Sequence, residues 1–221
     1  AGTMGSAIAA AFLDAGMHVT LVEQTAAKLS AGYALLSDLY ERQVKSGRLD
    51  PAARDARLAT VKATLHYEDL ASCQLIVEAV FEELQVKLDV LHKLASVAGP
   101  QTIIATNTSY LDVDVIAAAH TYPENVCGLH FFSPANVMKL LEIVDAERTS
   151  PTTLATILAV AKRLKKVPIV ARNAFGFIGN RIYSAYRRQA EFLMEEGASP
   201  YDIDSAMEAF GFAMGPFAVA D

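Results

Sequence analysis

Short apolar segments alternate with longer amphipathic ones along most of this 221-residue chain. The short segments are rich in Val, Ile and Leu, and the longer ones repeat apolar residues at helical spacing. The expected strands cover residues 18–23, 63–67, 75–81, 102–106, 126–132, 140–144 and 167–171. The expected helices cover residues 3–16, 25–46, 50–60, 83–98, 112–119 and 152–165. Short strands between helices predict βαβ units on a mostly parallel sheet, which is an α/β fold.

The pattern changes after Arg172. Residues 176–196 predict one long helix, the segment Gly197–Pro200 breaks it, and residues 201–210 predict another helix. We therefore expect two domains, an α/β domain over residues 1–172 and the start of a helical domain over residues 173–221.

Charge and cysteine content exclude several functional classes. Lys and Arg number 19 against 25 Asp and Glu, and the net charge of −6 offers no basic surface for nucleic acid. No apolar run is long enough to span a membrane. Cys73 and Cys127 lie far apart and match no metal or redox spacing. We expect no metal site and a reducing compartment.

Two glycines open the first predicted helix, and an acid ends the strand that follows it. Gly2 and Gly5 match the later part of a three-glycine dinucleotide fingerprint, whose first glycine would stand one residue before Ala1. The helix N-terminus would then face a pyrophosphate. Glu23 would accept hydrogen bonds from ribose hydroxyls and repel a 2′-phosphate, which predicts NAD rather than NADP. The alternative is a glycine pair that only caps a helix.

His130 and Glu142 are the strongest catalytic candidates. His130 lies in an apolar strand that runs into a proline turn, and strand ends in α/β sheets bind ligands. Glu142 is the only acid in the apolar run Met138–Val144, and a buried carboxylate needs a partner. Paired with Glu142, His130 would be a general base of the kind that oxidation of an alcohol requires. The alternative is a histidine satisfied within the core.

Ser109 and Asn180 are candidates for binding a substrate oxygen. Ser109 follows an apolar strand in the segment Thr106–Ser109, and Asn180 lies one turn into the long helix. The alternatives are a turn or helix cap for Asn107 and Ser109, and a packing amide for Asn180.

These segments together resemble the L-3-hydroxyacyl-CoA dehydrogenase family. The run Gly128–Glu142 is similar to the family signature, and the segments 77–83, 106–109, 176–181 and 214–217 match in the same order. Single-module members carry Asn-Pro-Val-Pro where this chain has Ser133–Asn136. With Leu111–Asp114 and Phe210–Phe212, this makes the chain more similar to the dehydrogenase module of multifunctional β-oxidation enzymes, which follows an enoyl-CoA hydratase domain.

The resemblance implies oxidation of (3S)-3-hydroxyacyl-CoA to 3-oxoacyl-CoA by NAD. It implies His130 as general base, Glu142 as its charge partner, and Ser109 and Asn180 as ligands of the substrate oxygens. Glu82 and Lys87 would lie along the nicotinamide half of the cofactor, and Lys45 would bind a CoA phosphate. The full set of expected cofactor-binding residues is Gly2, Thr3, Met4, Gly5, Glu23, Ala79, Glu82, Lys87 and Asn107.

The resemblance also implies a fold and partners. The fold is a Rossmann-type doubly wound sheet, whose first strand would precede Gly2, followed by an all-helical domain that would continue beyond Asp221. Without that strand the inner edges of residues 18–23 and 75–81 have no ladder partner, so we expect residues 1–221 alone to fold poorly or aggregate. The implied partners are an acyl-CoA substrate and either a second copy, bound through the helical domain, or a fused hydratase domain.

The compartment and two other functions stay open. We expect a bacterial-type cytoplasm, with the peroxisome or mitochondrial matrix as alternatives. The other functions are an NAD-dependent dehydrogenase of a free hydroxy acid or sugar acid, and a catalytically silent NAD-binding relative.

Overall fold

The computed structural model describes residues 2–219. The chain divides into two compact units, one ending at Ala174 and the other beginning at Phe175. The first unit is a sheet covered by helices, and the second contains helices α7 (Gly179–Glu195) and α8 (Pro200–Phe210). No helix within residues 2–219 is both long and apolar enough to cross a bilayer.

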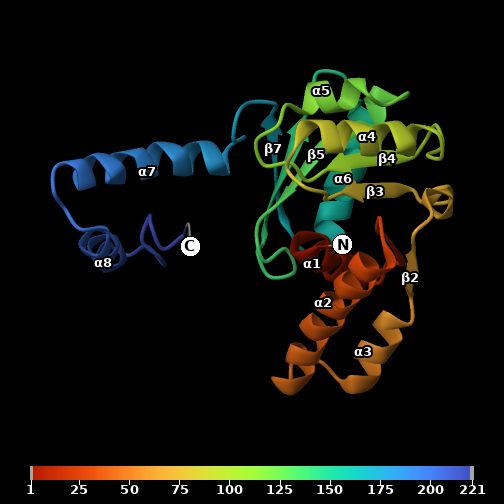
Figure 1. Ribbon diagram of the computed structural model, residues 1–221, viewed down its shortest axis with the longest axis horizontal. Helices are drawn as coiled ribbons and strands as arrows, with labels where there is room; N and C mark the ends of the chain where they lie inside the picture. The colour runs from red at the N-terminus through yellow and green to blue at the C-terminus, as the bar shows by residue number, and fades with distance from the viewer. Residues whose placement is uncertain (1, 220–221) are drawn as a thin grey trace. The chain divides into compact units, whose positions relative to one another are not determined.

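The first unit alternates helices and strands, as the sequence predicts (Figure 1). Its strands are β1 (Val19–Val22), β2 (Val61–Thr64), β3 (Leu75–Glu78), β4 (Ile103–Thr106), β5 (Val126–Phe131), β6 (Leu140–Asp145) and β7 (Val167–Arg172). Its helices are α1 (Thr3–Asp14), α2 (Ala26–Lys45), α3 (Pro51–Leu58), α4 (Leu84–Ala95), α5 (Val113–Ala118) and α6 (Pro151–Arg163), with 3₁₀ turns at Tyr67–Leu70 and Pro123–Asn125.

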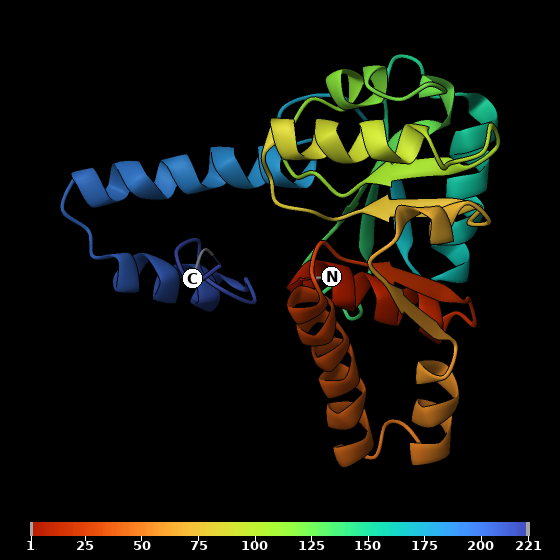
Figure 2. The ribbon, with the colours of Figure 1, turned by 45° about the vertical axis from the view of Figure 1, so that its right-hand side comes forward.

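The main sheet has the order β3-β4-β5-β6-β7. Strands β3, β4 and β5 are parallel, β6 is antiparallel to β5, and β7 is parallel to β6. Alternate residues of β4 face opposite cores: Ile103 and Ala105 pack with α1 and α6, whereas Ile104 packs with α4 and α5. Helices therefore cover both faces of this sheet, as Figure 2 shows from a second direction.

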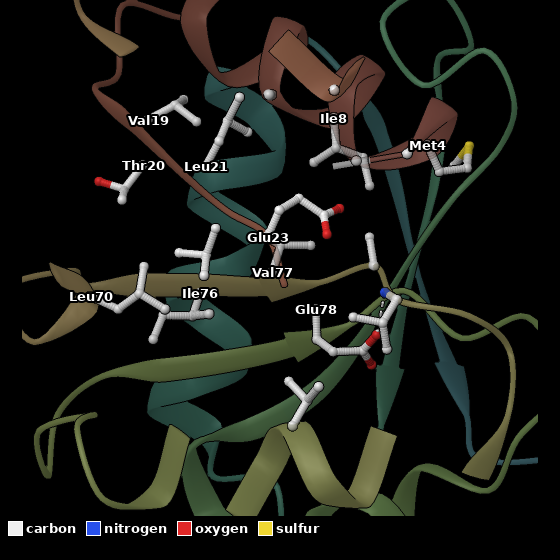
Figure 3. A pocket seen from close by; sticks show the side chains of 18 of the residues that line it. Met4, Ile8, Val19, Thr20, Leu21, Glu23, Leu70, Ile76, Val77 and Glu78 are labelled. Carbon is white, nitrogen blue, oxygen red and sulfur yellow. Dashed lines mark hydrogen bonds between the residues drawn. The ribbon is translucent and has the colours of Figure 1, made fainter. Parts of the chain in front are cut away.

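Strands β1 and β2 form a separate parallel pair. A cavity of about 800 Å³ lies between the edge of β1 and the edge of β3. Its walls are largely apolar and include residues of α1, such as Ile8, and of β3, such as Val77 (Figure 3). These are the two strand edges for which the sequence predicts no partner within residues 1–221.

Several predicted boundaries were wrong. β2 begins at Val61 and ends at Thr64. There the Thr64 hydroxyl donates a hydrogen bond to the Asp69 carboxylate and accepts one from the His66 N–H. β3 ends at Glu78 rather than at residue 81. Helix α7 begins at Gly179 rather than at residue 176, because Gly176 and Phe177 have positive φ angles of 69° and 47° that exclude a helix.

Gly128 is required by the close packing of β5 against β6. A Cβ atom at this position would lie 2.6 Å from the Cβ of Val144, the residue opposite it in the antiparallel register. No side chain fits there without moving the strand that carries Glu142.

We predict that Gly128→Ala lowers the free energy of unfolding of the intact protein by about 1–3 kcal/mol, the usual cost of overpacking a core. Urea denaturation followed by circular dichroism measures this loss. Gly99→Ala is the matched control, because a Cβ there would lie at an ordinary 3.7 Å from the Thr102 hydroxyl. Equal unfolding midpoints for the two variants would contradict the prediction.

Candidate active site

His130 and Glu142 face each other across β5 and β6. They are paired residues of the antiparallel register, and His130 Nδ1 lies 2.7 Å from Glu142 Oε2. Glu142 is 0% exposed and His130 is 4% exposed. A carboxylate with no access to water needs a hydrogen-bond donor, and the imidazole supplies it. The contact expected from the sequence is therefore made.

The end of β5 is tied to the end of β4. Asn107, which follows β4, accepts a hydrogen bond from the Phe131 N–H at 2.9 Å, and its own N–H donates to the Glu78 carbonyl at 2.8 Å. The Phe132 ring lies 4.5 Å from the His130 ring, measured between centroids. Asn107 thus joins three neighbouring strand ends next to His130.

Glu82 holds the segment that carries Ser109. Its Oε1 accepts hydrogen bonds from the Thr108 hydroxyl at 2.5 Å, the Ser109 N–H at 2.7 Å and the Tyr110 N–H at 3.1 Å. Partial burial alone would raise the pKa of Glu82. The hydrogen bonds and the Lys87 charge outweigh burial and lower the pKa, so the group stays ionised.

Lys87 lies inside the protein and connects two carboxylates. Its Nζ lies 2.9 Å from Glu78 Oε1 and 3.3 Å from Glu82 Oε2, and the side chains of Lys87 and Glu78 are 1% and 0% exposed. Glu78 also accepts hydrogen bonds from the Thr106 hydroxyl and the Val80 N–H, both at 2.7 Å. The ends of β3 and β4 are thus held by a buried, fully paired network.

The N-terminus of α1 opens into the large cavity. Gly2 is the N-cap without a side-chain cap, and the first helical hydrogen bond is from Ser6 N–H to the Gly2 carbonyl. The N–H groups of Thr3, Met4 and Gly5 therefore precede the helical ladder. A Cβ at Gly2 would meet no atom within 4 Å, and one at Gly5 would meet only Ala79 Cβ, at 4.0 Å.

These features fit a dinucleotide. Open space beside free N–H groups at a helix N-terminus suits a pyrophosphate. Glu23, just after β1, lines the same cavity and points into it between α1 and β3 (Figure 3). Its carboxylate is placed for ribose hydroxyls rather than for a 2′-phosphate.

Two further predicted residues are Asn180 and Lys45. Asn180 belongs to the second unit, in the first turn of α7 rather than one turn in. Lys45 ends α2; its side chain is 74% exposed and pairs with Glu41 at 3.9 Å. Within residues 2–219 no group of His, Cys, Asp and Glu is suited to a metal ion.

Sequence reasoning missed Glu78, Thr106 and Thr108. Glu78 carried the same signal as Glu142, a single acid in an apolar strand. Its partner could have been found on α4, because Lys87 is in helical register with the buried residues Val90, Leu91 and Leu94.

The fold and site define a Rossmann-type dinucleotide-binding protein with a buried histidine–carboxylate pair at the end of a strand. Comparison with known families places it more closely. The NAD binding domain of 3-hydroxyacyl-CoA dehydrogenase matches residues 1–174, and the C-terminal domain of the same enzyme matches residues 176–221. The chain belongs to the 3-hydroxyacyl-CoA dehydrogenase family.

The chain is also similar to individual proteins related to this family. The chain is 43% identical over 220 residues to the peroxisomal bifunctional enzyme of Cavia porcellus and 39% identical over 221 residues to a fatty acid oxidation complex subunit alpha of Shewanella sp.. It covers 30% and 31% of those proteins, so it spans about a third of their length. The (S)-3-hydroxybutyryl-CoA dehydrogenase PaaH1 from Ralstonia eutropha superposes with a TM-score of 0.95 at 34% identity, over 99% of this chain and 78% of that one.

We predict that Lys87→Met destabilises the intact protein by about 3–5 kcal/mol, because it leaves the Glu78 carboxylate buried without its cation. Chemical denaturation measures the loss. The double variant Lys87→Met/Glu78→Gln removes the stranded charge and is expected to recover part of the stability. A double variant less stable than Lys87→Met alone would show that the ion pair is not the cause.

Proposed function

We propose that this protein oxidises (3S)-3-hydroxyacyl-CoA thioesters to 3-oxoacyl-CoA with NAD. The buried pair of His130 and Glu142, at 2.7 Å, carries the proposal, because it provides a base supported by a carboxylate in a chain of this family. When bound, NAD supplies the acceptor for the hydride that leaves the carbinol carbon.

His130 takes the proton of the substrate hydroxyl. With Nδ1 donating to Glu142, the other ring nitrogen, Nε2, is the basic one. The Glu142 carboxylate fixes this tautomer and stabilises the imidazolium that forms. Burial of both side chains strengthens their interaction, because little water screens it.

Ser109 and Asn180 bind the oxygens of the substrate. Glu82 holds Ser109 through its backbone N–H, which leaves the hydroxyl to donate to the 3-oxygen. Asn180, at the start of α7, supplies an amide for the neighbouring thioester carbonyl. Each donor gains strength as negative charge develops on the oxygen that it contacts.

The phosphates of CoA have a basic cavity available in the first unit. This second cavity, of about 340 Å³, lies where the C-terminal ends of α1, α2 and α6 meet the loop between β5 and β6. Its walls include Arg48, Lys139, Arg163 and Lys165. Lys45, expected from the sequence to bind a phosphate, does not line it. We favour the cavity over Lys45, because several cations converge there.

The relatives support a proposal for the partners and the compartment. A second copy bound through the helical unit, or a hydratase domain in the same chain, is the partner we propose, since relatives named bifunctional are about three times longer. We propose a bacterial cytoplasm as the compartment, with the peroxisome, named for the eukaryotic relatives, as the alternative.

We predict that His130→Gln lowers kcat by about 10²–10⁴-fold, the usual contribution of a general base, while NADH still binds. Oxidation of NADH by acetoacetyl-CoA measures kcat, and NADH fluorescence measures binding. His92→Gln, on the exposed side of α4, is the control. Near-normal turnover by His130→Gln would overturn the role of His130.

The same assay separates the alternatives. A preference for acetoacetate over acetoacetyl-CoA would identify a dehydrogenase of free hydroxy acids. NADH binding with no turnover of any acyl-CoA would identify a silent relative.

We predict that Glu142→Gln lowers kcat about 10²-fold or more and changes the Kd for NADH little, because Glu142 contacts the base and not the cofactor cavity. Stopped-flow and equilibrium titration separate the two quantities. The reverse pattern, weak NADH binding with normal kcat, would make Glu142 a purely structural residue.

A further inference from the structure

Lys166 is a buried lysine at the turn between α6 and β7, beside the basic cavity. Its Nζ donates to the carbonyl of Ala135 at 2.5 Å and to the carbonyl of Met138 at 2.6 Å. Only 9% of the residue is exposed. Burial lowers the pKa of Lys166, and the charge of Asp14 opposes part of that shift. The two carbonyls accept hydrogen bonds from the ammonium.

Both carbonyls belong to the loop that joins the catalytic pair. Residues 132–139 connect β5, which carries His130, to β6, which carries Glu142. The loop exposes the side chains of Val137 and Met138, which are 63% and 41% exposed. Within the loop, the N–H groups of Val137 and Met138 donate hydrogen bonds to the Pro134 carbonyl.

Lys166 and Val167 make three hydrogen bonds to this loop. The Lys166 ammonium donates to two carbonyls, and the N–H of Val167 donates to the Lys139 carbonyl at 2.8 Å. Lys166 is itself fixed, because its N–H donates to the Ala161 carbonyl at the end of α6. The Phe131 ring, next to His130, has its centroid 6.0 Å from the same ammonium.

A lysine suits this place for a chemical reason. Two backbone carbonyls converge on one point, and an ammonium offers three donors in a compact group. An apolar side chain of equal length would leave both carbonyls unpaired near the core, and the loop would have to move to reach water.

From this geometry we propose that Lys166 is a positioning residue for the proposed dehydrogenase reaction: its ammonium fixes the loop 132–139 and thereby the place of His130 and Glu142 against the substrate. The inference rests on the proposed function. Small errors in the placement of a catalytic group are costly, since a shift of about 1 Å can cost about 10²-fold in rate.

The test is kcat per cofactor site in the intact protein carrying Lys166→Met, with NADH titration counting the folded sites. We expect kcat to fall about 10–100-fold. The Kd for NADH is expected to stay unchanged, because the cofactor cavity is built from α1, β1 and β3. Lys166→Gln, which keeps donors without the charge, is expected to fall between Lys166→Met and wild type. It also carries the test if Lys166→Met does not fold. Lys162→Met, on the exposed side of α6, is the matched control.

A second substrate separates positioning from phosphate binding, because Lys166 also lines the basic cavity. Acetoacetyl-pantetheine has the thioester without the phosphates of CoA. A loss of kcat with both thioesters supports positioning, whereas a loss only with acetoacetyl-CoA overturns it. A kcat per site within about twofold of wild type also overturns it. Wild-type protein that binds NADH but turns over neither thioester overturns the proposed function and this inference with it.

Discussion

The antiparallel pairing of β5 with β6 is the contact on which the site depends, because it places a buried carboxylate opposite His130. Glu142 is 0% exposed, and a buried carboxylate is stable only where hydrogen-bond donors such as the His130 ring face it. The register that makes the pair also places Val144 against Gly128. Strand direction, the glycine and the histidine–carboxylate pair therefore all follow from one register.

A buried, paired carboxylate also fixes the neighbouring strand ends. Glu78 at the end of β3 is buried and paired with Lys87, and Thr106 at the end of β4 donates to it. Glu82 then extends this network to the backbone of Ser109. Loops at the carboxyl ends of parallel strands have few backbone partners of their own, so buried side chains supply the bonds that fix them.

Sequence alone predicted the alternation of strands and helices, because each element carries a clear period of apolar residues. It also predicted the contact of His130 with Glu142, since a single acid in an apolar strand must have a partner. It did not predict the reversal of β6, although a connection of residues 132–139 without a helix is too short for a parallel crossover. The partner of Lys166 could not be predicted, because backbone carbonyls have no signature in the sequence.

The net charge describes the surface as a whole but does not predict the charge around a single cavity. A net charge of −6 argues against a broad basic surface, yet Arg48, Lys139, Arg163 and Lys165 converge on one cavity. These residues come from different parts of the chain and are spread over more than a hundred positions, so no run of basic residues in the sequence indicates the cavity. Two of them, Arg163 and Lys165, lie at the C-terminal end of α6, where the helix dipole favours cations even without a ligand. The fold therefore gathers positive charge at a place where it costs little, and that place is beside the loop held by Lys166.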